Sequence, residues 1–199
     1  MTREQPHDRG EIACQQVLIH DASVFSIQWV VLPSHHAPQL TPERLLQRYL
    51  DHVRRSTLGL VRPQAGGSGI EFRLLATGFS LLTFRSPLLD TTQHGSSATL
   101  QICGGILVQA RQCHRGQLVF RSQPVGQGIR VTLELSEYCP LLLGSPVPAR
   151  WRKLLYRLTQ AYIHKFVTVR FLARLYRELQ GGSRRVRVVA VTVKEGEKT

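Results

Sequence analysis

Residues 150–180 contain neither Gly nor Pro, and their apolar side chains recur at helical spacing. On a helical wheel, one half of the circumference collects apolar residues and the other half collects mostly basic and polar ones. Pro146 and Pro148 precede this stretch and Gly181 follows it, as is typical of helix boundaries. We therefore predict one long amphipathic helix over Arg150–Gln180. Its apolar side requires a partner surface, most simply a β-sheet.

Lys165 interrupts the apolar side of this predicted helix. In one interpretation the side chain snorkels, with a buried stem and a hydrated ammonium group. In the other, Lys165 faces an internal cavity, where it pairs with an anionic ligand or acts as a nucleophile or base. On that second interpretation, Tyr162, Phe166 and Val169 line the wall of the cavity beside it.

Ile163, Val167 and Phe171 form a second apolar stripe, on the polar side of the wheel, at i, i+4 and i+8. Two explanations remain open at this point. Either a following segment, residues 186–193, covers the stripe, or the stripe is a self-association surface that forms a homodimer.

The formal net charge is +13, which favours anionic partners such as nucleic acid, an acidic membrane surface, or a phosphorylated or carboxylate ligand. The chain has 22 Arg, 4 Lys and no Asn, which indicates a GC-rich bacterial genome and explains the excess of Arg over Lys, but not the shortage of acids. The basic side of the predicted helix is either simply solvated or a surface for phosphate contacts without base readout. Its candidate polyanion-binding residues are Arg152, Lys153, Arg157, Arg170, Arg174 and Arg177.

A shorter helix is predicted near residues 41–58. Thr41 is a typical N-cap, Pro42 suits the first helical position, and Glu43 lies near the positive end of the helix dipole. Strands are predicted from runs of Val, Ile, Phe and Trp, and from alternation of apolar and polar residues. These strands cover residues 12–20, 24–32, 70–76, 79–85, 99–109, 117–123, 129–136 and 186–193, with connections at 63–69 and 87–95.

The element order is strands, a helix, a run of antiparallel strands and a long C-terminal helix. The predicted fold class is therefore α+β, with a curved antiparallel sheet packed around the C-terminal helix. Over residues 12–180 this order resembles the helix-grip superfamily of START-like lipid-transfer domains and polyketide cyclases, also called SRPBCC proteins. The resemblance implies an internal cavity under the long helix. Two strands before the first helix and one after the last depart from the family's pattern.

The composition, with 42% apolar residues in 199, is typical of a single globular domain. We expect that domain at residues 12–194, between flexible tails at 1–11 and 195–199. No apolar run is long enough to span a membrane and no signal segment is evident, so we expect a cytoplasmic protein. Four scattered cysteines predict reduced, buried thiols: Cys14, Cys103, Cys113 and Cys139.

Motifs for nucleotide binding, zinc hydrolases and serine hydrolases are absent, so no cofactor and no catalytic residue is predicted. His35 and His36 share one loop, and Asp90 and His94 share another. These side chains would suit zinc only if the two loops met, which nothing in the sequence indicates, so no metal is predicted.

The leading hypothesis is a non-enzymatic domain that binds a small hydrophobic or amphipathic anionic ligand in an internal cavity. One alternative is a peripheral binder of nucleic acid or an acidic lipid surface, acting through the basic side of the 150–180 helix. Another is a cyclase or hydratase on the same scaffold, for which only Lys165, His164 and Tyr162 are available as polar groups.

Overall fold

The structure is a computed structural model that describes residues 9–75, 77–112, 114–144, 151, 152, 156, 161–181 and 185–198. Its main elements are one curved sheet of eleven strands and two helices, α1 (Pro42–Ser56) and α3 (Tyr162–Gln180). The strands are β1 (Arg9–Leu18), β2 (Val24–Pro33), β3 (Val61–Gly66), β4 (Gly69–Leu74), β5 (Ser80–Arg85), β6 (Leu88–Thr92), β7 (Gly95–Gly104), β8 (Gln117–Val125), β9 (Gly128–Tyr138), β10 (Arg185–Ala190) and β11 (Glu197–Lys198). Three short 3-10 helices are η1 (Ser34–Gln39), η2 (Ala110–Gln112) and η3 (Leu141–Leu143).

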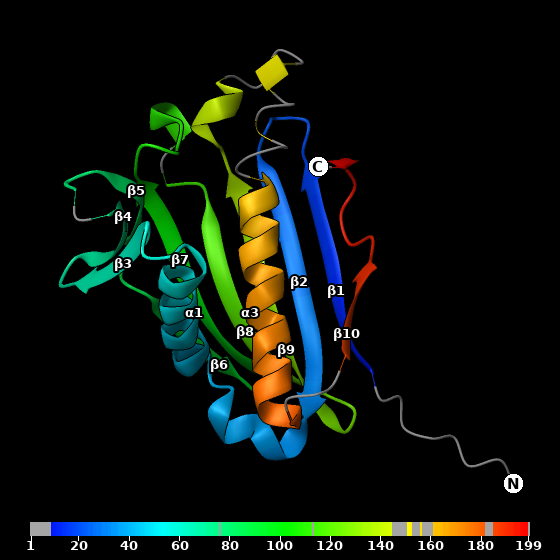
Figure 1. The fold of residues 1–199 in the computed structure, drawn as a ribbon. Coiled ribbons are helices and arrows are strands. Elements are labelled where there is room, and N and C mark those ends of the chain that lie inside the picture. Colours follow the sequence, from blue (N-terminus) through cyan, green and yellow to red (C-terminus); the bar gives the residue numbers. More distant parts are fainter. Residues whose placement is uncertain are drawn as a thin grey trace, which may run out of the picture.

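The strands follow the order β10-β1-β2-β9-β8-β7-β5-β4-β3, with β11 paired to β1 and β6 paired to β7. Neighbouring strands are antiparallel, except that β10 runs parallel to β1. The exception follows from α3, which returns the chain to the end of the sheet where β1 begins (Figure 1). The predicted strands before α1 and after α3 are both present.

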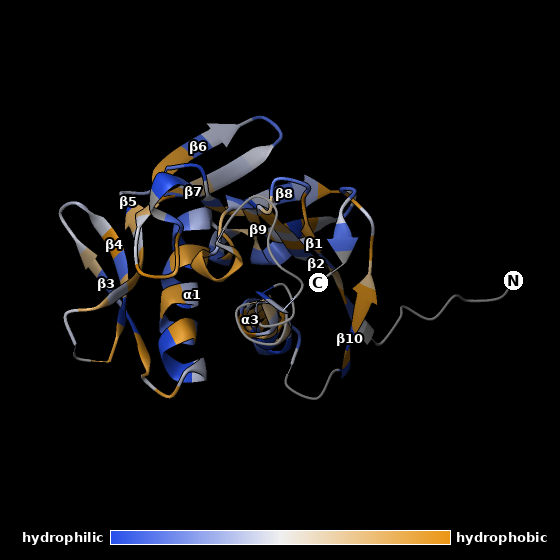
Figure 2. Ribbon diagram, turned by 90° about the horizontal axis from the view of Figure 1, so that it is seen from above, coloured by the Kyte–Doolittle hydropathy of each residue, from blue (hydrophilic) through white to orange (hydrophobic). Residues whose placement is uncertain are grey.

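The sheet curves around α1 and α3, which lie side by side on its concave face (Figures 1 and 2). The main core fills the space between the two helices and the inner face of the sheet. Aromatic side chains connect the helices to the sheet within this core. The Tyr49 ring of α1 packs edge-on against Phe120 of β8 and Phe171 of α3, with ring centroids 5.2 Å and 5.4 Å away. The predicted fold class, α+β with a curved sheet packed around a long C-terminal helix, is confirmed.

The sequence signals for α1 correspond to its geometry. The Oγ1 of Thr41 accepts a hydrogen bond from the Arg44 N–H at 3.5 Å, and Pro42 occupies the first turn. The apolar side of α1 is buried against the sheet and α3 through Leu45, Leu46, Tyr49, Leu50 and Val53. The helix predicted near residues 41–58 is therefore confirmed.

The predicted C-terminal helix, Arg150–Gln180, is described continuously only from Ala161 onward. Trp151, Arg152 and Tyr156 are helical, while residues 145–150, 153–155 and 157–160 lie outside the described residues. The helix α3 ends at Gly181, whose φ of +85° is a conformation that glycine adopts readily. The helical nature of residues 162–180 is thus confirmed.

Two segments predicted as connections are strands. β3, at residues 61–66, contains Pro63, which is tolerated because β3 is the edge strand. β6 forms a hairpin with β7, but all of its residues are exposed, so it lacks the half-buried alternation that marks a strand in sequence. Strand pairing also extends into both expected tails, since β1 begins at Arg9 and β11 pairs with β1.

No helix in the described parts of the chain is both long and apolar enough to cross a membrane.

Candidate functional site

A cavity of about 230 Å³ lies between α1, the first turns of α3 and the inner face of the sheet. Its walls are built mostly from aliphatic and aromatic side chains of both helices and of strands β3, β4, β5, β7, β8 and β9. The described lining residues are Tyr49, Val53, Thr57, Val61, Phe72, Leu81, Leu82, Phe84, Ile102, Leu107, Leu118, Leu135, Tyr138, Tyr156, Ile163, His164 and Val167. None of these lining residues is an acid, a lysine or an arginine. The cavity is therefore suited to an apolar ligand.

Three tyrosines line the cavity, and burial keeps their phenols protonated. Desolvation raises the pKa of Tyr49 to about 12. Burial likewise raises the pKa of Tyr138 and of Tyr156. The Tyr138 hydroxyl donates to the Leu107 carbonyl oxygen at 2.9 Å. The tyrosines therefore add polarity to the wall without adding charge.

His164, on the first turn of α3, is the most unusual group in the wall. Its Nε2 atom is buried and has no hydrogen-bond partner in the described part of the chain. Burial lowers the pKa of His164 to about 4, because the charged imidazolium would lose its hydration. The ring is thus neutral at pH 7, and one of its nitrogens is free to bond a ligand.

The residues predicted to line the cavity lie elsewhere. Lys165 is exposed, Tyr162 is 61% exposed and Phe166 is 39% exposed, while Val169 packs at the edge of the core. None of these four residues lines the cavity. The wheel placed Phe166 and Val169 on the buried side of the helix. The residues that α3 actually buries are Val167, Thr168, Phe171, Leu172, Ala173, Leu175 and Tyr176.

Two of the three residues of the second stripe belong to this buried side. Val167 is 7% exposed and Phe171 is 3% exposed, and both belong to the main core, while Ile163 is 55% exposed. The hypothesis of a homodimer contact through Ile163, Val167 and Phe171 is therefore wrong, because two of its three members are already covered. They are covered by α1 and the sheet, and not by residues 186–193.

A buried polar cluster beneath α3 is absent from the sequence-based predictions. Gln16 donates to the Ala161 carbonyl at 3.2 Å, Ser26 donates to Gln16 at 3.3 Å, and Gln28 donates to Ser26 at 2.7 Å. Cys14 lies opposite Gln28 in the β1–β2 register. The alternation Val24, Ser26, Gln28, Val30 on the inner face of β2 is the signal that could have revealed this cluster.

Cys14 and Cys139 are buried free thiols, as predicted, whereas Cys103 is only partly buried. Burial raises the pKa of Cys14 and of Cys139, which disfavours their reactive thiolate forms. Cys113 lies outside the described residues.

The predicted polyanion-binding residues separate into three groups. Arg170, Arg174 and Arg177 line a groove on the outer side of α1 and α3. The Arg152 guanidinium lies over the Trp151 ring at 5.2 Å, away from that lining. Lys153 and Arg157 lie outside the described residues.

Within the described parts of the chain, no three His, Cys, Asp or Glu side chains lie close enough together to hold a metal ion. The His35 and His36 rings contact each other at 3.9 Å within η1. Asp90 lies on β6, and His94 lies in the turn that joins β6 to β7.

Neither a family model nor a curated protein matches this chain. Among solved structures, the chain is similar to the Aha1 dimer from Colwellia psychrerythraea, with 15% identity and a TM-score of 0.42 over 79% of this chain and 96% of that one. It is also similar to CalU16 from Micromonospora echinospora. The crystal structure of CalU16 gives 13% identity and a TM-score of 0.37 over 86% of this chain and 91% of that one. Its solution structure gives 14% identity and a TM-score of 0.38 over 92% and 81%.

Proposed function

We propose that this protein binds a small, uncharged, mainly apolar molecule in the cavity beneath the first turns of α3. The observation that carries the proposal is the combination of an apolar wall with the unpaired, buried Nε2 of His164. A buried polar atom without a partner costs free energy, and a ligand that bonds to it recovers part of that cost.

The size of the cavity limits the ligand. A cavity of roughly 150 Å³ in another protein holds benzene, and this one measures about 230 Å³. A single aromatic ring with one or two substituents is therefore of the right size, and a full-length lipid chain is not.

The chemistry of the wall also indicates an uncharged ligand. Since the tyrosines and His164 are neutral at pH 7, the described residues of the cavity wall provide no positive charge to compensate an anion. This revises the anionic ligand inferred from Lys165, whose side chain is outside the cavity lining. A hydroxyl or carbonyl group on the ligand is the expected partner of His164.

Calorimetric titration with phenol, toluene and benzoate tests the proposal at pH 7.5. We expect phenol to bind with a Kd of about 0.1 to 1 mM, a binding free energy of about −4 to −5.5 kcal/mol. Toluene should bind more weakly because it cannot bond to His164. Benzoate should not bind detectably, because its carboxylate would be buried without a counter-charge. Equal binding of phenol and benzoate, or no binding of either neutral ring, would contradict the proposal.

Two variants locate the binding site. Val61→Phe fills space from the partly buried edge strand β3 and should abolish phenol binding with little loss of stability. His164→Leu should leave toluene binding intact and remove the preference for phenol. Native mass spectrometry of the purified protein then identifies any small molecule that occupies the cavity in cells.

A further inference from the structure

A groove runs along the outer side of the two helices, separate from the cavity. Its first part, about 370 Å³, is lined by His52, Arg55 and Ser56 of α1 and by Ala173 and three arginines of α3. The i, i+4 and i+7 spacing of Arg170, Arg174 and Arg177 places them on one side of α3. No acid lines this part of the groove among the described residues.

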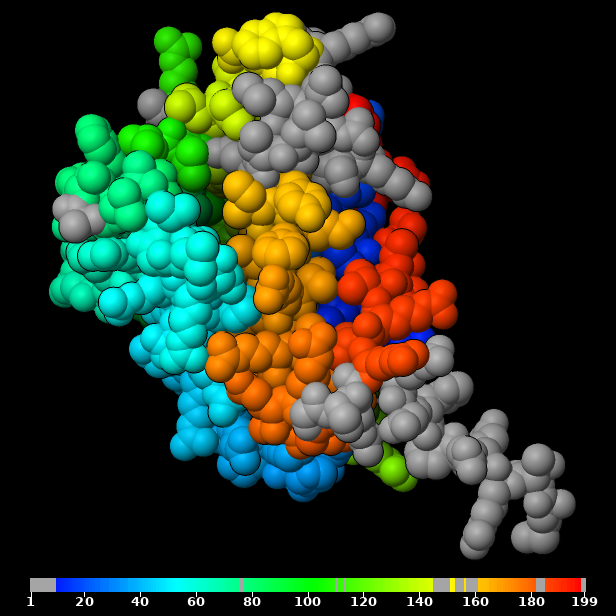
Figure 3. Space-filling model, viewed as in Figure 1, coloured from blue at the N-terminus to red at the C-terminus, as the bar shows by residue number. Residues whose placement is uncertain are grey.

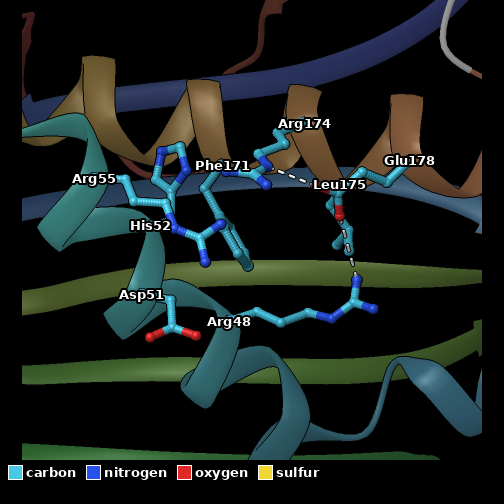
Figure 4. A pocket seen from close by; sticks show the side chains of 8 residues that line it. All are labelled: Arg48, Asp51, His52, Arg55, Phe171, Arg174, Leu175 and Glu178. Atoms are coloured by element: carbon cyan, nitrogen blue, oxygen red, sulfur yellow. Dashed lines mark hydrogen bonds and ion pairs between the residues drawn. The ribbon is translucent and has the colours of Figure 1, made fainter.

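The second part of the groove, about 220 Å³, shares His52, Arg55 and Arg174 with the first and adds Arg48, Asp51 and Glu178. Figure 4 shows these side chains converging from α1 and α3. Glu178 pairs with Arg174 at 2.6 Å and with Arg48 at 3.8 Å (Figure 4). In the described structure, Arg55, Arg170 and Arg177 have no carboxylate partner.

Like charges held together on a folded surface repel each other, so an unneutralised cluster of guanidinium groups favours an anion. Guanidinium groups on two facing helices bond the oxygens of a single phosphate from opposite sides. A concave, confined groove fits a compact anion better than an extended nucleic-acid strand. Nucleic acid would also favour exposed aromatic rings for base stacking. Among the described residues that line the groove there is no Trp or Tyr, and the one Phe, Phe171, is only 3% exposed.

His52 supplies an independent observation. It is 6% exposed, and its Nε2 contacts the Ser56 hydroxyl at 2.8 Å and the Val167 carbonyl at 3.2 Å. Its Nδ1 is buried and has no hydrogen-bond partner among the described residues. Burial lowers the pKa of His52 first, and Arg174, Arg170 and Arg55 lower it further. An anion in the groove would counteract these arginines and favour the imidazolium form of His52. In that form Nε2–H donates to the Val167 carbonyl, and Nδ1–H is available to donate to the anion.

We propose that the groove between α1 and α3 binds a phosphate dianion, with Arg55, Arg170 and Arg174 as the charged contacts and His52 as a buried donor. The same chemistry occurs in a free phosphate or phosphomonoester and in the headgroup of phosphatidic acid. Both sources present three oxygens and two negative charges.

The test measures binding of the full chain to inorganic phosphate by calorimetry, and to phosphatidylcholine vesicles with and without phosphatidic acid by flotation. Arg55→Gln and Arg170→Gln each remove one unpaired guanidinium and should weaken binding by about tenfold. Arg85→Gln, at the exposed end of β5, removes the same charge elsewhere and should change binding by less than twofold. Binding to soluble phosphate identifies a free phosphorylated ligand, and binding only to phosphatidic acid vesicles identifies a headgroup.

A second readout follows the His52 ring by NMR during pH titration. The charged groups that line the groove with it are Arg48, Asp51 and Arg55 of its own helix and Arg170, Arg174, Arg177 and Glu178 of α3. Phosphate should raise the pKa of His52, because the dianion stabilises the imidazolium. This shift should be absent in Arg170→Gln at the same phosphate concentration.

The proposal is overturned if neither phosphate probe shows saturable binding. It is also overturned if a duplex oligonucleotide binds while phosphate does not, with equal losses in Arg55→Gln, Arg170→Gln and Arg85→Gln. That pattern would indicate a diffuse attraction for polyanions. Both outcomes are independent of the cavity, since the titration with phenol involves none of these arginines.

Discussion

The cavity and the groove are built by the same two helices, yet they are chemically opposite. The side of α1 and α3 that faces the sheet encloses a neutral, apolar space. The outer side carries five arginines around a groove, with two acids at one end. Figure 3 shows the outer surface of α3 exposed between α1 and the C-terminal strands. The comparison shows that one layer of two helices can carry a neutral site on the side that faces the sheet and a charged site on its outer side.

Two residues connect these regions physically. The Val167 side chain lines the cavity, while its backbone carbonyl contacts the His52 ring of the groove. Phe171 is packed between Tyr49 of the cavity wall, at 5.4 Å, and His52, at 5.6 Å. The two sites are therefore separate in chemistry and adjacent in packing.

The largest expected effect comes from Phe171→Ala, which removes the ring that is packed between Tyr49 of the cavity wall and His52 of the groove. We expect a loss of about 3 to 5 kcal/mol in the free energy of unfolding, measured by urea denaturation, and weaker binding at both sites. Phe166→Ala is the matched control on the same helix. Its ring is 39% exposed and contacts the Arg170 guanidinium at 5.0 Å, so its removal should cost less than about 1 kcal/mol. Equal costs for the two variants would contradict the assigned orientation of α3.

Acidic pH should lower the free energy of unfolding, because His164 of the cavity wall is buried in its neutral form. Since the pKa of His164 falls from 6.5 in the unfolded chain to about 4 in the folded one, the unfolded state binds a proton first as the pH decreases. Above pH 6.5 both states are neutral and His164 has no effect. Between about pH 6.5 and 4, this one residue should lower the free energy of unfolding by about 1.4 kcal/mol per pH unit, or about 3 kcal/mol in total.

Urea denaturation across this pH range measures the effect, and His164→Leu should remove that part of the slope. His52, whose pKa is also lowered, contributes a further decrease of the same sign, which the variant retains. An unchanged slope in His164→Leu would show that the ring is not buried in its neutral form.

The dependence of stability on salt, which arises from the arginines of the groove, should be the smallest of the three effects on the free energy of unfolding. Added chloride screens the repulsion among the arginines, so the free energy of unfolding should rise by up to about 1 kcal/mol between low salt and 0.15 M. Arg170→Gln should reduce this dependence, and Arg85→Gln should reduce it less because its charge lies away from the cluster. A salt dependence that is identical in the two variants would show that the arginines of the groove do not repel one another.

The sequence determined those elements whose local signals agree with each other. The α1 helix has a capping Thr41, a Pro at its first position and one apolar side, and all three signals place it where it is found. The hairpin of β8 and β9 has strong alternation on both sides of a glycine-containing turn, and its position is also as predicted. The order of strands and helices, and from it the α+β class, could therefore be predicted, as could the excess of positive charge.

Tertiary structure alone decided which side of α3 is buried. Apolar residues surround more than half of this helix, so two orientations had similar local support, and packing of Val167 and Phe171 against α1 selected one. The edge strands β3 and β6 follow from pairing with their neighbours, not from their own composition. Both candidate sites depend on contacts between segments far apart in the chain: His52 meets Val167 across 115 residues. Local patterns of apolar and charged residues specify elements, but only packing specifies which elements face each other and what lies between them.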